Sequence, residues 1–224
     1  MNRTQVPIFE LENLRVTRDG RTALKISQFQ FHRGTTYGIL GPVGSGKTTL
    51  LEILAGRIKP TEGRVLYEKK RFARTWLGRI KVPREIVFLE EKSNGFTGTV
   101  QQYLQKRLPD RVDYIRQQYF SRPPLSSEWE MAVSSLSRGH SYRMNMIVAI
   151  ESDPKVLIID DYGINFDSQM RRDFDRRLSY SARKRGTTVI LSSTDMVNVK
   201  NVASVVVSLD NGHIAKVRSL KKGQ

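Results

Sequence analysis

The chain has 224 residues, contains no cysteine and carries a formal net charge of +16 at pH 7. Its length suits one domain of ordinary size, or one domain with a small subdomain, and the lack of cysteine excludes a disulfide framework and thiol chemistry. The charge favours an anionic partner, such as a nucleotide, an acidic membrane surface, nucleic acid or an acidic protein, while no stretch approaches the roughly 20 apolar residues that span a bilayer.

The first part of the chain is predicted to form a hairpin, then a strand, a turn and a helix. Strands are expected over residues 9–16 and 24–31, and the Asp-Gly pair at 19–20 is a hairpin turn signal. A short apolar strand over residues 37–40 leads into a glycine-rich turn. The helix expected over residues 48–55 has a face of apolar residues that can be buried.

Residues 69–84 form a strongly basic segment that contains no acidic residue. Its basic residues are Lys69, Lys70, Arg71, Arg74, Arg79, Lys81 and Arg84. Phe72 and Trp76 stand between these charges, a combination that suits nucleic acid or a lipid interface. The alternative is a solvent-exposed edge of a β-sheet, whose charges discourage pairing with another edge.

Strand and helix patterns alternate through the rest of the chain. Strands are expected over residues 85–89, 155–159, 187–192, 203–209 and 214–217, and helices over residues 99–108, 111–120, 126–150 (interrupted at 136–139) and 170–184. This alternation predicts an α/β fold with a mainly parallel central sheet. We also expect an antiparallel β subdomain near the N-terminus and a helical subdomain over about residues 92–150, all within one domain, 1–224. The basic tail over residues 216–224 is expected to fray.

The chain contains a complete phosphate-binding loop of the pattern G-x-x-x-x-G-K-[ST]. The loop residues are Gly41, Pro42, Val43, Gly44, Ser45, Gly46, Lys47, Thr48 and Thr49. Gly44 and Gly46 allow the backbone to curl so that its N–H groups point at phosphate oxygens. Lys47 would reach the β- and γ-phosphates, and the Thr48 hydroxyl would ligate Mg²⁺. The alternative is a chance glycine-rich turn, but a strand before the loop and a helix after it are the setting that the motif requires.

A second nucleotide motif follows the apolar strand over residues 155–159. Asp160, at the carboxyl end of this strand, is predicted to hold Mg²⁺ beside the loop. Asp161 comes next and is predicted to polarise the attacking water. The alternative is a strand end that is capped by two turn-forming acids.

With these motifs, the chain resembles the nucleotide-binding domain of ABC ATPases over nearly its whole length. Residues 136–140 stand where that family has its Leu-Ser-Gly-Gly-Gln signature, and Ser137 and Gly139 match it. Asp167 matches the Asp of the family's dimer-contact loop. The resemblance implies a P-loop NTPase fold, the cofactors ATP and Mg²⁺, and a head-to-tail dimer. In that dimer Ser137 and the Gly139 backbone would contact the γ-phosphate of the opposing site.

Three positions expected to act in catalysis depart from the family pattern. Glu91 aligns with the family's Gln, with Glu90 as the alternative, and a carboxylate there can still ligate Mg²⁺. Asp161 stands where the family usually has its catalytic Glu, and its arm is shorter. Thr194 stands at the switch His and cannot carry the positive charge of an imidazolium. We therefore expect nucleotide and Mg²⁺ binding to persist, and hydrolysis to be slow or dependent on a partner.

Two further positions concern the base and the signature. The family's adenine-stacking aromatic is not apparent; Thr17 or Arg18 stands near its place, and Arg18 could stack its guanidinium on the base. His140 is either a pH-sensitive donor that faces the partner's nucleotide or a polar residue at a helix start.

The resemblance implies an ATPase that is the ATP-binding subunit of an ABC transporter. Such a subunit is cytoplasmic, lies at the inner face of the cell membrane, and works with a second nucleotide-binding domain and separately encoded transmembrane subunits. An anionic membrane surface is a further expected contact. The alternative is a regulatory or weakly catalytic ABC-type subunit that binds nucleic acid or a protein assembly. Steep salt dependence of binding to DNA or RNA would favour this alternative.

Overall fold

A computed structural model describes residues 6–89, 96–123, 125–164 and 166–220. Its strands are β1 Pro7–Arg18, β2 Arg21–His32, β3 Thr36–Leu40, β4 Glu62–Tyr67, β5 Lys70–Arg71, β6 Ala73–Arg74, β7 Ile80–Lys81, β8 Ile86–Leu89, β9 Val156–Ile159, β10 Thr188–Ser193, β11 Val205–Asp210 and β12 His213–Ser219. Its α-helices are α1 Lys47–Leu54, α2 Val100–Arg107, α3 Val112–Tyr119, α4 Arg138–Glu151, α5 Ser168–Tyr180 and α6 Met196–Val199. Shorter helical segments are the 3₁₀ turns η1 Pro109–Arg111, η2 Leu125–Glu130 and η3 Val133–Ser135, and the π turn η4 Ser181–Arg185.

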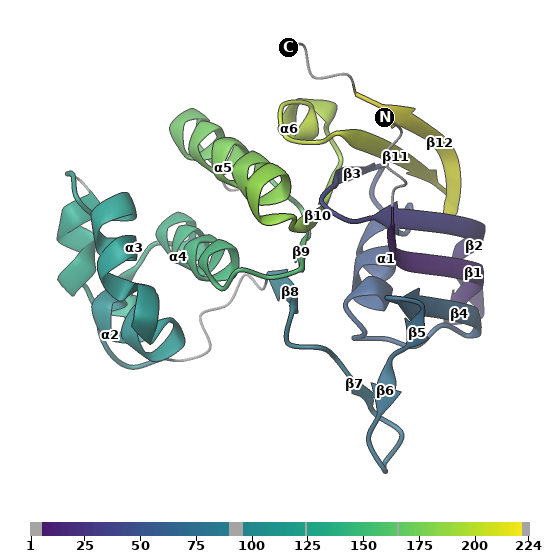
Figure 1. The fold of residues 1–224 in the computed structure, drawn as a ribbon. Helices are drawn as coiled ribbons and strands as arrows, with labels where there is room; N and C mark the ends of the chain where they lie inside the picture. The colour runs from purple at the N-terminus through teal and green to yellow at the C-terminus, as the bar shows by residue number, and fades with distance from the viewer. Residues whose placement is uncertain (1–5, 90–95, 124, 165, 221–224) are drawn as a thin grey trace.

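The central sheet has six strands in the order β12-β11-β3-β10-β9-β8 (Figure 1). Neighbouring strands from β11 to β8 run parallel, whereas β12 pairs antiparallel with β11. Alternate residues of β9 face two different cores. Val156 and Ile158 join the apolar cluster around α1, and Leu157 and Ile159 join the cluster around α4 and α5. Burial on both faces explains why this strand reads as a continuous apolar run, and the predicted mainly parallel sheet is confirmed.

A second sheet, with the order β2-β1-β4-β5, is antiparallel. Leu11 of β1 and Val65 of β4 pack with Leu50 and Leu54 of α1 in one apolar cluster that also includes residues of the central sheet. The helix that follows the phosphate loop is therefore enclosed between two sheets. The turn at 19–20 has both residues at positive φ, the geometry of the hairpin turn that the Asp-Gly pair predicts.

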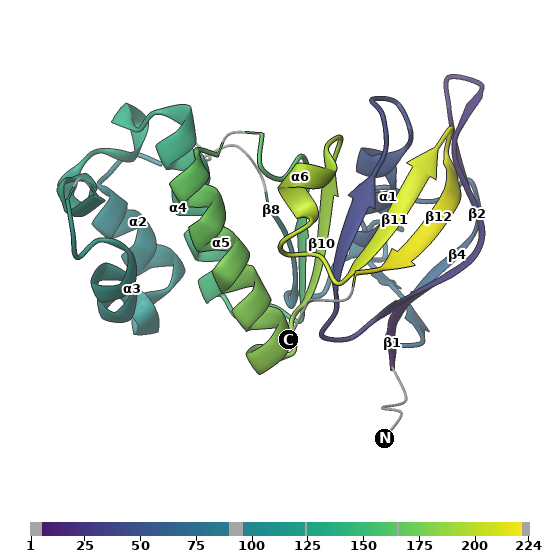
Figure 2. The ribbon, with the colours of Figure 1, turned by 90° about the horizontal axis from the view of Figure 1, so that it is seen from above.

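The remaining large helices lie on the other side of the central sheet from α1 (Figures 1 and 2). Helices α4 and α5 lie next to the sheet, and α2 and α3 lie outside α4. None of the helices in the described part of the chain is long and apolar enough to cross a bilayer.

The prediction of a helix over residues 126–150 is wrong for the part before residue 138. The chain there forms the 3₁₀ turns η2 and η3 instead of an α-helix. The N–H of Val100 donates to the carbonyl oxygen of Met131 at 3.0 Å, and the N–H of Val133 donates to that of Gly98 at 2.8 Å. These bonds tie the segment to the start of α2, so its backbone groups are not available for a continuous helical ladder.

Two other expectations also need correction. The expected helix over residues 170–184 is α-helical only to Tyr180, because η4 completes it as a π turn. The basic tail was expected to fray from residue 216, but β12 continues to Ser219 and pairs with Val205 of β11. Residues 221–224 lie outside the described residues.

Glu151, at the end of α4, joins three parts of the helical side. Its carboxylate is 2% exposed, accepts a hydrogen bond from the Tyr119 hydroxyl at 2.6 Å, and pairs with Arg111 at 3.0 Å and Arg185 at 3.3 Å. Burial raises the pKa of Tyr119, so its hydroxyl stays protonated and donates to the carboxylate. This network fixes α3 and the end of α5 on α4, the helix that begins in the signature segment.

Candidate nucleotide-binding site

Three neighbouring parallel strands end at one edge of the central sheet, and a predicted site residue follows each of them. Strand β10 lies between β3 and β9, and all three run parallel. Gly41 follows β3, Thr194 follows β10 and Asp160 follows β9. This edge is where open α/β sheets bind their ligands. The fold therefore brings the phosphate loop, the switch position and the metal-binding position to one end of the sheet.

Two glycines of the loop leave no room for a side chain. A Cβ on Gly41 would lie 2.3 Å from the carbonyl oxygen of Leu209 and 2.4 Å from Ser45 Oγ. Gly46 has a φ of +98°, and a Cβ there would lie 2.7 Å from the carbonyl oxygen of Ala23. Any other residue at these positions would push the loop away from β11 or β2, so the motif glycines fit this loop to its neighbours.

The outer part of the loop is open. Pro42, Val43 and Gly44 are exposed, and Val43 has 91% of its surface in contact with solvent. Gly44 has a φ of +81°, the left-handed conformation that the curl of the loop requires.

Lys47 lies at the centre of the loop. It is 6% exposed, and its Nζ donates to the carbonyl oxygens of Gly41 and Pro42, each at 2.9 Å. The Ser45 hydroxyl is buried and has no hydrogen-bond partner among the described residues. A buried polar atom without a partner needs an explanation, and an outside acceptor or donor supplies one. The ammonium, this hydroxyl and the start of α1 together fit the phosphate chain of a nucleotide.

Thr48 and Asp160 are the predicted Mg²⁺ ligands. Thr48 is exposed in the first turn of α1, whereas Thr49 is buried. Asp160 is half-buried, and its Oδ1 accepts hydrogen bonds from Ser192 Oγ and, at 3.1 Å, from the backbone N–H of Asp161. These bonds orient the carboxylate. Hydroxyl and carboxylate oxygens are the ligands that Mg²⁺ prefers, with phosphates and waters completing its shell.

Ser192, on β10, links the two acids and was missed by the sequence analysis. Its hydroxyl contacts Asp160, and it accepts from the backbone N–H of Asp161 at 2.8 Å. Asp161 is exposed and has a φ of +50°, a left-handed backbone conformation directly after β9. The available signal was a hydroxyl residue near the carboxyl end of an apolar strand, which is too common to single out from sequence.

Thr194 and Arg18 stand at the ends of two different strands, β10 and β1. Thr194 is exposed directly after β10, just before α6. Arg18 ends β1, and its guanidinium pairs with Glu52 of α1 at 2.6 Å. This ion pair holds Arg18 against the helix that begins at the phosphate loop. The guanidinium that was predicted to stack on the base is thus already paired with Glu52.

The two signature residues are not brought to this chain's own loop. Ser137 caps α4 by accepting from the backbone N–H of His140 at 3.3 Å, and Gly139 has open space around it. Helix α4 packs in the core on the opposite face of the sheet from α1. Glu128 is 4% exposed and pairs with Arg143, and it lies 3.6 Å from Nδ1 of His140, so it fixes the first turns of this helix.

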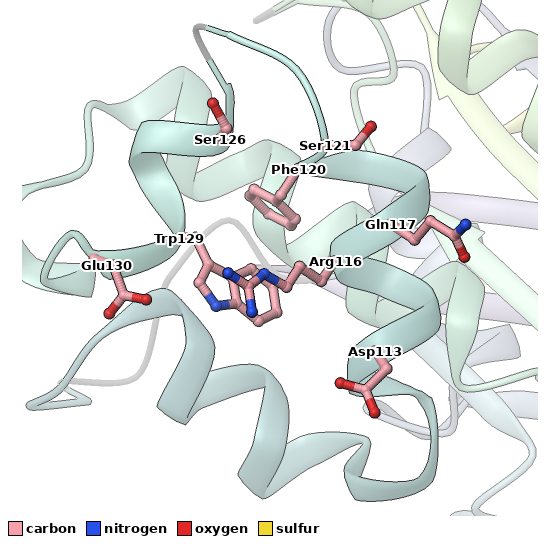
Figure 3. Close-up of a pocket in the computed structure, with 8 residues that line it drawn as sticks. All are labelled: Asp113, Arg116, Gln117, Phe120, Ser121, Ser126, Trp129 and Glu130. Carbon is pink, nitrogen blue, oxygen red and sulfur yellow. The ribbon is translucent and has the colours of Figure 1, made fainter.

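Glu91 and its alternative, Glu90, lie outside the described residues. A pocket of about 520 Å³ between α3 and η2 contains none of the predicted site residues (Figure 3). In it, the Arg116 guanidinium lies 5.5 Å from the centre of the Trp129 ring. This pocket belongs to the helical side of the molecule, away from the edge where the nucleotide motifs meet.

Comparison with known proteins identifies the family of the chain. The ABC transporter family model matches residues 24–162. The chain is 26% identical to the spermidine/putrescine import ATP-binding protein PotA of Mycoplasma capricolum, covering 94% of this chain but only 61% of PotA. It is also 26% identical to the zinc uptake system ATP-binding protein ZurA of Listeria innocua, covering 91% of this chain and 82% of ZurA. The dimeric structure of MJ0796, a bacterial ABC transporter cassette, matches with a TM-score of 0.79 at 20% identity over 96% of this chain and 100% of that one.

The matched region begins in β2 and includes both the phosphate loop and the acid pair. It covers more than half of the chain, and the fold agrees with that of a solved ABC cassette over nearly the whole chain. The resemblance that the sequence motifs indicated is thereby confirmed: the chain belongs to the ABC transporter family and is a nucleotide-binding domain of the ABC ATPase class.

Proposed function

We propose that the chain is the ATP-binding and ATP-hydrolysing subunit of an ABC transporter, with residues 1–224 acting as one nucleotide-binding domain. The observation that carries the proposal is the centre of the phosphate loop, where the Lys47 ammonium lies at the same sheet edge as Asp160, beside a Ser45 hydroxyl that has no partner among the described residues. The loop residues hold the phosphates. Thr48 and Asp160 hold Mg²⁺, with Glu91 as a further ligand.

Hydrolysis in this proposal depends on the residues beyond β9 and β10. Asp161 orients and polarises the attacking water, and the Thr194 hydroxyl bonds a γ-phosphate oxygen. Both groups are weaker than the Glu and His that the family usually has at these positions, because one arm is shorter and the other is uncharged. Turnover is therefore slow unless a partner completes the site.

A second nucleotide-binding domain completes each site. Ser137 and Gly139 begin a helix that packs on the other face of the sheet, so they serve a nucleotide bound to another chain. The first turn of α4 offers backbone N–H groups to a γ-phosphate. The solved structure of the similar cassette MJ0796 is described as dimeric, which supports this arrangement.

Gly139→Asp tests the shared site. Because a Cβ at Gly139 meets no heavy atom of the described residues within 4 Å, the side chain should be tolerated in the monomer. Its carboxylate would repel the partner's γ-phosphate, so Mg-ATP should double the mass of the wild-type chain in light scattering but not that of the variant. Gly139→Ala is the matched control and should still dimerise. Dimerisation of Gly139→Asp would contradict the arrangement, provided that its ATP affinity is unchanged.

The membrane partner docks, in this proposal, beside β8. A groove of about 330 Å³ lies between β8, α2 and α4, lined by Phe88, Tyr103, Arg107 and Asn145 among others. The relatives PotA and ZurA are named as ATP-binding proteins of import or uptake systems. The chain would thus work on the cytoplasmic side of the membrane, attached to separately encoded transmembrane subunits.

Purification from native membranes tests this partnership. A tagged chain that is expressed at its natural level should be recovered from detergent extracts with a multi-spanning membrane protein. Arg107→Glu, in the wall of the groove, should reduce that recovery, and Arg172→Glu on the exposed side of α5 should not. Recovery of nucleic acid in place of a membrane protein would favour the non-transport alternative.

A further inference from the structure

The small hairpin β6–β7 ends in two exposed apolar residues. Trp76 is 92% exposed and Leu77 is 60% exposed. They are the central residues of a tight turn, in which the Gly78 N–H donates to the Thr75 carbonyl oxygen at 2.9 Å. Turns favour Gly, Asn, Asp, Ser and Pro at such positions. A tryptophan and a leucine held together in solvent at a turn therefore indicate a partner that covers them.

The hairpin is anchored at its base and stands out from the body of the molecule (Figure 1). Lys59 Nζ donates to the carbonyl oxygen of Gly78 at 2.7 Å, so it also holds the turn at the tip. Side-chain atoms of Ile80 and Val82 lie 3.1 Å from where a Cβ on Gly56 would stand, so the base packs closely on the end of α1. The hairpin is thus a fixed projection, with a tip that the described residues leave uncovered.

Basic residues precede and follow this tip along the segment 69–84, with Arg74 on β6 and Lys81 on β7. Lys69, Lys70, Arg71, Arg74, Arg79, Lys81 and Arg84 are all exposed, and none of them forms an ion pair with an acidic side chain of the described residues. Arg74 lies two residues before Trp76, and Arg79 lies two residues after Leu77. The charges nearest to the tip therefore lie beside the turn, and the Lys59 ammonium adds another at Gly78.

We propose that this hairpin docks the chain on an anionic phospholipid surface. Trp76 and Leu77 enter the boundary between headgroups and acyl chains, and the basic residues of 69–84 contact the phosphates above it. An apolar tip with basic residues behind it suits interfacial insertion, in which apolar groups enter about 5–10 Å into the headgroup boundary. Tryptophan is enriched at this level of the bilayer, and basic side chains near the surface gain from anionic lipid.

Lipid fits the tip better than nucleic acid does. A base can stack on Trp76, but Leu77 offers a base no flat face, whereas both residues gain when they leave water for the lipid interface. The choice also rests on the proposed function, because a transporter subunit works beside a bilayer. The hairpin would give the chain a contact with lipid in addition to its contact with the membrane subunits.

Tryptophan fluorescence tests the insertion directly. The chain has two tryptophans, and Trp129 is 4% exposed beneath Arg116 (Figure 3), so a change in emission on binding reports Trp76. Vesicles of phosphatidylcholine with phosphatidylglycerol should shift the emission to shorter wavelength and sediment the chain. Vesicles of phosphatidylcholine alone should do neither. Trp76→Phe should still sediment but lose the spectral shift.

Charge variants separate the hairpin from the general charge of +16. Arg74→Gln with Arg79→Gln and Lys81→Gln should weaken vesicle binding by about 100-fold, since each basic side chain near the surface contributes roughly a factor of five. The control removes the same charge from exposed positions elsewhere, by Arg172→Gln, Lys184→Gln and Lys216→Gln. The control should bind vesicles within about threefold of wild type, because charges more than a Debye length from the surface are screened.

Three results would overturn the proposal. The first is an unchanged Trp76 emission on anionic vesicles, and the second is an equal loss of binding in the hairpin and control variants. The third is a Trp76 response to single-stranded oligonucleotide that exceeds the response to vesicles, which would assign the hairpin to nucleic acid. All variants should bind ATP as wild type does. If the wild-type chain binds ATP but does not bind anionic vesicles, the docking surface is refuted and the proposed function still stands.

Discussion

Replacing Lys47 with alanine should weaken ATP binding by about 100-fold or more, because the ammonium makes charge-assisted hydrogen bonds worth about 1.5–3 kcal/mol each. In the structure Nζ donates to two loop carbonyls at the centre of the curl, where it is also placed to meet a phosphate. Isothermal titration calorimetry of the chain with Mg-ATP measures the change. Unchanged affinity would falsify the assignment of the loop.

Two controls separate the charge from the shape of the loop. Lys47→Met keeps the hydrocarbon chain and should lose affinity as much as Lys47→Ala does, because the phosphates lose the same cation. Lys184→Ala removes an exposed lysine at the end of the α5–η4 helix and should bind ATP normally. Thermal unfolding without nucleotide shows whether loss of the two carbonyl contacts alone unfolds the loop. A variant that melts like wild type but no longer binds ATP isolates the role of the charge.

The parallel strands of the central sheet could be predicted because each is short, mainly apolar and bounded by turns. The strand Val156–Ile159 is buried on both faces, and all four of its residues are apolar, as such burial requires. The turns at 19–20 and 210–212 were also readable, since Gly20, Asn211 and Gly212 have the positive φ values that such turns need. Local chemistry alone determines these elements.

The elements that sequence reading missed depend on contacts with distant residues. The 3₁₀ turns before α4 form because Met131 and Val133 bond to the start of α2, some 30 residues away. The β6–β7 hairpin has strands of two residues each, too short for an alternating pattern. Its sequence was readable as a basic segment with aromatics, but its projection from the body follows from how its base packs on the end of α1.

In the candidate site, the loop motif was enough to predict which residues form the loop. The residues that pack around the loop are known only from the structure. The motif alone does not show that a side chain on Gly41 would strike the backbone of Leu209, or that the Ser45 hydroxyl is buried without a partner in the described part of the chain. Ser192 was missed because it contacts the acid pair only through the pairing of β10 with β9. The order of strands in the sheet cannot be read from the sequence alone. The assignment of Thr194 stays a prediction.

Asp161 offers the sharpest test of catalysis, because its backbone is fixed. Its N–H donates to Ser192 Oγ at 2.8 Å and to Asp160 Oδ1 at 3.1 Å, so a substitution changes the side chain and not the path of the chain. Asp161→Asn keeps the shape and removes the charge. If the carboxylate polarises the attacking water, turnover should fall by about 100-fold or more, the usual contribution of a general base. ATP affinity should be unchanged.

Asp161→Glu should act in the opposite direction and raise turnover by about tenfold, because the longer arm brings the carboxylate within hydrogen-bond reach of the water. The φ of +50° opposes the change, since Asp tolerates the left-handed region better than Glu does. The variant should therefore be slightly less stable in urea unfolding and yet faster in a phosphate-release assay. Lower stability without a gain in turnover would mean that arm length is not what limits hydrolysis. If Asp161→Asn also hydrolysed ATP at the wild-type rate, Asp161 would be only the turn-forming acid that ends β9.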